Sequence, residues 1–149
     1  MDSINALINK LNDNAIDEVY WLGSANRESI TTLKDALSID LPSDFMSFLS
    51  ITGGGGVVGE EISGIVNNDV FIESGGSIYY DTMNCRKDFE LPLHLCVIYF
   101  KDDDVCWCID CSDYKYGSVI NYDLFSKKIT GILHPSFMSF FNEYVELRV

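Results

Sequence analysis

Apolar side chains recur at helical spacing in four segments of the chain. The pattern predicts a helix over residues 3–12, a second after the N-cap residue Asn26, a third that begins at Pro42, and a last one after Pro135. The short apolar stretch over residues 19–22 is expected to be a loop or a brief strand. The predicted buried faces consist of Ile4, Leu7, Ile8 and Leu11, of Ile30, Leu33 and Leu37, of Phe45, Phe48 and Leu49, and of Phe137, Phe140, Phe141 and Tyr144.

Strand patterns dominate the middle of the chain. Residues 60–65 and 69–72 have strand character, and a helix is expected over residues 77–87. Residues 94–100 are almost wholly apolar, which predicts a strand in the centre of a sheet. An acidic turn, Lys101 to Asp104, joins this strand to residues 105–110 in the strongest hairpin pattern of the sequence. Two further strands are expected over residues 118–124 and 128–133.

This order of elements predicts an α+β fold in one domain, residues 1–149. Helices fill the N-terminal third, one helix lies mid-chain and one closes the C-terminus, around a mostly antiparallel sheet. A chain of 149 residues is long enough to bury about 70% of its unfolded surface in a single core. With 47% hydrophobic residues, the composition is that of a folded globular protein.

Four consecutive glycines, Gly53 to Gly56, follow the third helix and are expected to end it, because they can adopt positive φ angles. Gly54, Gly56 and Gly59 also have the spacing of a dinucleotide-binding loop. That motif must follow a strand and open a helix, whereas here it follows a helix and opens a predicted strand. The adjacent acids Glu60 and Glu61 would repel phosphate, so a structural turn is the favoured interpretation.

The cysteines raise the question of a metal site. Cys106, Cys108 and Cys111 lie within six residues, but a structural zinc site needs a second, similarly spaced pair of ligands. Only Cys96 and His94 are near in sequence, so buried core cysteines are favoured over metal, and no metal or other cofactor is expected. The odd count of five cysteines indicates reduced thiols.

Catalytic motifs are scarce in this sequence. His94 and His134 are the two histidines, and both are interpreted as structural or solvated. Carboxylates are abundant, yet no spacing singles out an acid/base pair, so a small hydrolase is left as an open alternative without a catalytic residue. The run Asp102 to Asp104 lacks the spacing of a calcium loop and is expected to be a solvated hairpin tip or a docking surface.

The net charge is −13, from 23 acidic and 10 basic residues. Residues 53–126 hold thirteen acids against four bases, whereas residues 127–149 hold two acids against three bases. Such a field repels nucleic acid and attracts cationic partners, although acidity also serves solubility alone. The first residues lack the positive segment of a secretory signal, and no apolar run approaches the roughly 20 residues that span a bilayer. We therefore expect a cytoplasmic protein with neither nucleic-acid nor membrane partners.

The order of these motifs resembles the SUKH superfamily (SMI1/KNR4-like), and the resemblance covers almost the whole chain. The hairpin turn has fewer glycines than is usual in the family, and the cysteine-rich second strand is particular to this chain. The matching residues are Leu41-Pro42, Phe45, Phe48-Leu49, Gly53 to Gly56, Ile62 and Gly64, the hairpin that ends at Asp110, and the closing segment 136–141.

The resemblance implies a non-enzymatic α+β domain that binds and neutralises a cognate bacterial toxin, and many such toxins are cationic nucleases. A regulatory or scaffold protein of the same superfamily, acting in cell-wall synthesis or signalling, is the alternative. The oligomeric state is left open. The candidate residues for binding a cationic toxin are the acids Glu60, Glu61, Asp69, Glu73, Asp102, Asp103, Asp104 and Asp113.

Overall fold

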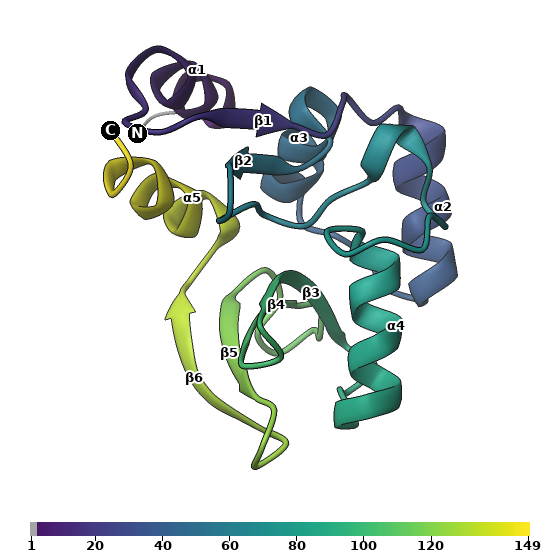
Figure 1. Cartoon of the computed structure of the whole chain (residues 1–149). Helices are drawn as coiled ribbons and strands as arrows, with labels where there is room; N and C mark the ends of the chain where they lie inside the picture. Colours follow the sequence, from purple (N-terminus) through teal and green to yellow (C-terminus); the bar gives the residue numbers. More distant parts are fainter. Residues whose placement is uncertain (1–2) are drawn as a thin grey trace.

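The computed structural model describes residues 3–149, so Met1 and Asp2 of the predicted domain lie outside the described residues. It confirms the α+β class (Figure 1). Within residues 3–149, no helix combines the length and the apolar character needed to cross a bilayer. The elements in chain order are α1 (Ile4–Asn14), β1 (Val19–Trp21), α2 (Arg27–Leu37), α3 (Ser43–Thr52), β2 (Gly55–Val57), the 3₁₀ helix η1 (Val66–Asn68), α4 (Ile78–Phe89), β3 (Leu95–Lys101), β4 (Val105–Asp110), β5 (Val119–Asp123), β6 (Lys128–His134) and α5 (Phe137–Glu146).

Polar caps fix the starts of the helices. The side chains of Ser3, Asn26, Ser77 and Ser136 each accept a hydrogen bond from a backbone N–H in the first turn of α1, α2, α4 and α5. The predicted cap at Asn26 is therefore confirmed. Pro42 is the N-cap residue of α3, one position before the helix begins.

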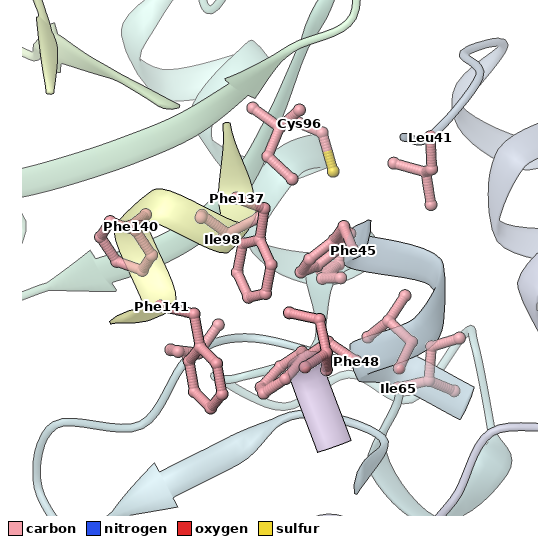
Figure 2. Close-up of a cluster of buried hydrophobic side chains, with 14 of the residues drawn as sticks. Leu41, Phe45, Phe48, Ile65, Cys96, Ile98, Phe137, Phe140 and Phe141 are labelled. Carbon is pink, nitrogen blue, oxygen red and sulfur yellow. The ribbon is translucent and has the colours of Figure 1, made fainter. Parts of the chain in front are cut away.

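An aromatic cluster joins α3 to α5 and to one face of the four-stranded sheet (Figure 2). The rings of Phe45 and Phe137 meet at a centroid distance of 4.8 Å, and those of Phe48 and Phe141 at 5.0 Å. Figure 2 shows that Ile98 of β3 points into the same cluster. Each such ring pair contributes about 0.5–1.5 kcal/mol beyond the area it buries. The predicted apolar faces of α3 and α5 thus meet each other.

The four-stranded sheet has the order β3-β4-β5-β6 and is antiparallel throughout. Residues of β3 alternate between two cores: Cys96 and Ile98 face the aromatic cluster, whereas Leu95 and Val97 face the side covered by α4. The prediction that β3 is central in the sheet is wrong, because β3 is an end strand. Its apolar composition reflects burial of both faces.

Two predicted strands, residues 60–65 and 69–72, are also wrong. The backbone N–H groups of Ile62, Ser63, Gly64 and Ile65 donate to Gly55, Ile98, Gly76 and Gly53 respectively, so successive residues bond to different segments. A strand ladder needs one continuous partner, and this segment has none. In residues 69–72, the carboxylate of Asp69 accepts from the N–H of Phe71 and forms a turn instead.

The glycine run has a structural role, and part of it forms the unpredicted strand β2, which pairs with β1. A Cβ atom on Gly54 would lie 2.6 Å from Cα of Gly64, and one on Gly56 would lie 2.4 Å from Oη of Tyr144. Atoms at these separations overlap, so glycine is required at both positions. The run therefore brings the end of α3, the loop before η1 and α5 into direct contact.

Helix α4 confirms the prediction over residues 77–87 and extends it to Phe89. It buries the carboxyl of Asp81, which accepts hydrogen bonds from Oγ of Ser63 and from the N–H of Gly76. Burial raises the pKa of Asp81 above its usual value, and the two hydrogen bonds offset this only in part. Asp81 thus joins α4 to the loop before η1 at a cost in desolvation.

We predict that Gly54→Ala lowers the free energy of unfolding by about 3 kcal/mol or more, because φ is +105° and the new Cβ meets backbone. Gly75→Ala is the matched control, since nothing lies within 4 Å of its Cβ position, and we expect a change within about 0.5 kcal/mol. Urea unfolding of both variants measures the difference. Equal stabilities would contradict the close approach at Gly54.

We predict that Asp81→Asn raises the melting temperature at pH 7, because the amide oxygen keeps both acceptor roles without the buried charge. With a raised pKa, the stability contributed by the protonated carboxyl is present in acid and is lost as the pH rises through the folded-state value. The advantage of the variant should therefore shrink as the pH falls toward about 4. Asp88→Asn removes an exposed charge from the same helix and serves as the control in thermal melts.

Candidate functional site

The eight predicted partner-binding acids do not form one cluster. Because β3 and β4 are antiparallel, Asp113 lies beyond the opposite end of β4 from the hairpin tip. Asp69 and Glu73 lie in the loop before α4, where the neighbouring Asn68 bonds to residues at the start of α2. The structure thus separates three locations: Glu60, Glu61 and Asp102 to Asp104 near the end of β3; Asp69 and Glu73 before α4; and Asp113 after β4.

Glu60 is held by Arg148 from beyond the end of α5. Nε and Nη2 of Arg148 lie 2.6 Å and 2.5 Å from Oε2 of Glu60. The guanidinium also stacks on the ring of Tyr144, 3.8 Å from its centroid. The hydroxyl of Tyr144 donates to the backbone carbonyl of Glu60 and accepts from the N–H of Val57. Burial raises the pKa of Tyr144 to about 12, so it stays a neutral donor at physiological pH.

Glu61 forms a second ion pair next to the first. Its carboxylate lies 3.3 Å from Nζ of Lys101, which is also 5.1 Å from the ring centroid of Tyr99. Burial favours a higher pKa for Glu61, but backbone N–H groups and Lys101 together hold that pKa below its usual value. Burial and the nearby carboxylates, that of Glu60 first, raise the pKa of the Tyr99 hydroxyl. The carboxylate of Glu61 is therefore ionised beside a neutral tyrosine.

The tip of the β3–β4 hairpin carries three exposed carboxylates, Asp102, Asp103 and Asp104. Asp102 and Asp103 adopt φ angles of 56° and 50°, and the N–H of Asp104 donates to the carbonyl of Lys101. In the described part of the chain, no ion pair engages these three side chains. Their charge faces solvent, unlike that of Glu60 and Glu61.

A cleft of about 370 Å³ lies between α5 and the face of the sheet that α5 covers. Ring contacts connect the floor of this cleft to Tyr99, the tyrosine beside Glu61. The rings of Tyr99 and Trp107 stack with their centroids 4.6 Å apart, and Trp107 meets Phe140 edge to face at 5.8 Å. We call this the aromatic cleft. The residues that line it are Trp107, Leu133, His134, Phe140, Glu143, Tyr144, Leu147 and Arg148.

At one side of the aromatic cleft, the lining residues His134 and Glu143 contact each other, and His134 also contacts Ser139. Nδ1 of His134 lies 2.9 Å from Oγ of Ser139, and Nε2 contacts the carboxylate of Glu143. Acyl transfer would also need free N–H donors beside the serine. The N–H groups of Met138 and Ser139 are already bonded, to Asp44 and to Ser136 respectively. We therefore interpret this string of side chains as a link between β6 and α5.

The cysteines occupy the core, as the sequence favoured. Cys106 and Cys108 are fully buried on the α4 side of the sheet, with their sulfurs 3.7 Å apart. Burial raises the pKa of the Cys108 thiol, and it raises that of Cys111 to about 12, so both stay protonated at neutral pH. Within residues 3–149, no group of three or more histidine, cysteine, aspartate or glutamate side chains is placed to hold a metal ion.

Sequence reasoning missed Arg148, Trp107 and Tyr99 as parts of this surface. The excess of bases over acids in residues 127–149 was the one signal for Arg148, since a basic end in an acidic chain favours an internal partner. Nothing local marks Trp107 or Tyr99, because their contact depends on strand register. Tyr144 was predicted as a buried helix residue, which is confirmed, but its polar contacts were not foreseen.

Comparison with models of protein families gives a match over most of this chain. No curated protein matches this sequence. The family model described as SMI1-KNR4 cell-wall, of the SUKH group, matches residues 4–146. That range includes the glycine run, the β3–β4 hairpin and most of the aromatic cleft. Because the match covers nearly the whole chain, the protein belongs to the SUKH (SMI1-KNR4) family.

Proposed function

We propose that this protein is an immunity protein, which binds a cognate secreted or contact-delivered bacterial toxin and blocks it in a one-to-one complex. The toxin domain is cationic and of the nuclease type. The protein acts in the cytoplasm and makes or breaks no covalent bond. Membership of the SUKH family supports this class of function.

The contact between Arg148, Glu60 and Tyr144 illustrates the chemistry by which this surface holds a cation. A guanidinium already lies there against a carboxylate and an aromatic ring, within 2.6 Å of the acid. Carboxylate and ring together favour a cation through charge and through the ring quadrupole. A toxin that binds nucleic acid offers lysine and arginine side chains of the same chemistry.

The three acids at the hairpin tip, Asp102 to Asp104, are the observation that carries the proposal. Within residues 3–149 no ion pair engages their side chains, whereas Glu60 and Glu61 nearby are paired with Arg148 and Lys101. Burial and nearby carboxylates, with Asp102 among them, raise the pKa of Tyr99, and the Tyr99 ring stacks on Trp107, which lines the aromatic cleft. Acids beside an apolar hollow form an interface with a charged rim and an aromatic centre. Such a surface blocks a nuclease by placing carboxylates where the phosphates would bind.

A regulatory or scaffold role is the second candidate, because the matching family is described by the term cell-wall. Such a protein would bind a component of the host's own cell-wall or signalling machinery. The two functions differ in one observable, which is whether the protein protects cells from a toxin.

Co-expression with the product of the adjacent reading frame tests the proposal. Cells that produce that product alone should stop growing, and cells that also produce this protein should recover. The two proteins should then co-purify in equal amounts. If the neighbouring product is harmless, or if growth arrest persists with both proteins folded, the immunity function is wrong.

We predict that replacing Asp102, Asp103 and Asp104 together by asparagine slows association with the toxin about tenfold at low salt. Asparagine tolerates the positive φ angles at the tip, so the hairpin should persist. The difference should nearly vanish above about 0.5 M salt, where charges are screened within a few ångströms. Stopped-flow or biosensor kinetics measure both rates.

The matched control replaces Asp69, Glu73 and Asp113 by their amides, so that it also removes three negative charges, but from the other two locations. This variant should change the association rate by less than about threefold, because only general attraction is reduced. If both triple variants slow association equally, the acids of the hairpin tip have no special role in attracting the toxin.

A further inference from the structure

A second hollow, of about 200 Å³, adjoins the aromatic cleft. Leu147 and Arg148, which follow α5, line both and join the two hollows. The other walls come from the loop after α1 and from the segment that begins with β2, in keeping with the packing of α5 beside α1 (Figure 1). The residues that line the second hollow are Ile16, Asp17, Val57, Glu60, Leu147 and Arg148.

Apolar side chains form a large part of this lining. Ile16 and Leu147 are 75% and 70% exposed, whereas Val57 is buried. Exposed apolar side chains that lie side by side and are rimmed by polar groups are typical of an interaction surface. The second hollow therefore favours an occupant that brings carbon atoms as well as charge.

The loop that carries Asp17 is held on both sides of this residue. The N–H of Ile16 donates to the carbonyl of Arg148 at 3.0 Å, and the carbonyl of Glu18 accepts from the N–H of Val58 at 2.9 Å. A wall that is fixed before binding avoids the entropy cost of ordering it. The second hollow is thus formed before its occupant arrives.

The charges of the second hollow leave one carboxylate without a partner. Its lining contains two acids, Asp17 and Glu60, and one base, Arg148, which holds Glu60. Among residues 3–149, no ion pair or hydrogen bond engages the side chain of Asp17. A cation can therefore pair with Asp17 and leave the contact between Arg148 and Glu60 in place. One positive charge balances the lining.

We propose that the second hollow binds one lysine or arginine side chain of the partner protein. The aliphatic stem of such a side chain packs against Ile16 and Leu147, and its charged end pairs with Asp17. A wholly apolar side chain would desolvate Asp17 without pairing it, and an acidic one would be repelled. The identity of the partner as a toxin rests on the proposed function, whereas the chemistry of the hollow can be tested without the toxin.

NMR titration with blocked amino acids tests the second hollow directly. The probes are N-acetyl-lysine methylamide and N-acetyl-norleucine methylamide, which differ only in the ammonium group. The lysine probe should shift the amide signals of Ile16, Asp17 and Leu147 and saturate with a Kd of about 1–10 mM, as expected for a ligand of this size. The norleucine probe should bind at least about threefold more weakly, because it brings no charge to Asp17. N-acetyl-arginine methylamide then distinguishes the two basic side chains.

Two variants assign the effect of charge to one residue. Asp17→Asn should abolish the difference between the lysine and norleucine probes. Glu18→Gln is the matched control, since Glu18 is the adjacent exposed acid and does not line the hollow, and it should keep the difference. Shifts that spread over the acidic surface without saturation overturn the proposal. A difference between the probes that survives in Asp17→Asn overturns it as well.

The complex with the toxin separates this inference from the proposed function. Asp17→Asn and Leu147→Ala should each raise the dissociation rate about threefold or more, because the basic side chain loses its ion pair or its packing. Glu18→Gln should leave that rate within about twofold. Protection from the toxin with an unchanged dissociation rate in Asp17→Asn would refute the hollow and leave the immunity function intact. Saturable binding of the lysine probe without any protection would refute the immunity function and leave the hollow as a site for a basic side chain.

Discussion

The structure depends on a close approach of backbone segments that side chains would prevent. A Cβ atom at Gly54 would meet Gly64 at 2.6 Å, and one at Gly56 would meet the Tyr144 hydroxyl at 2.4 Å. This contact lets Tyr144 bond at once to β2 and to the carbonyl of Glu60. The glycines, which resemble a nucleotide-binding loop in spacing, thus position an acidic surface that would repel a nucleotide's phosphates.

The aromatic cluster explains how one face of the sheet contains both a buried core and an open cleft. Phe45, Phe137 and the other rings between α3 and α5 cover part of that face. Beyond them, Phe140 meets Trp107, and the rings become progressively accessible in the aromatic cleft. Core and cleft are joined by continuous ring contacts, so packing against the core restricts the rotamers open to the side chains of the cleft floor. Rigid aromatic side chains lose little conformational entropy on binding a partner.

Local signals in the sequence predicted what local physics determines. Helical periodicity and caps such as Asn26 placed the helices within a few residues. The prediction of a strand over residues 60–65 failed because the N–H groups of this segment bond to three different segments, the glycine run, β3 and the loop before α4, which no local pattern reveals. β3 was predicted to lie at the centre of the sheet, because an edge strand that is buried on both faces has the same apolar sequence pattern as a central strand. The acids were predicted as candidate binding residues from their charge. The ion pair between Arg148 and Glu60 was not predicted, because the two residues are 88 positions apart in the sequence.

The distribution of paired and unpaired acids has a consequence for how the surface would work. Glu60 and Glu61 are already ion-paired and partly desolvated, so an incoming cation has to exchange with Arg148 or Lys101. Exchange of one pair for another gains little free energy, since exposed pairs contribute about 0–1 kcal/mol each. The unpaired acids at the hairpin tip face no such competition and act at long range. Attraction would then come from Asp102 to Asp104, while discrimination among cationic partners would come from shape in the aromatic cleft, where burial of rings outweighs charge.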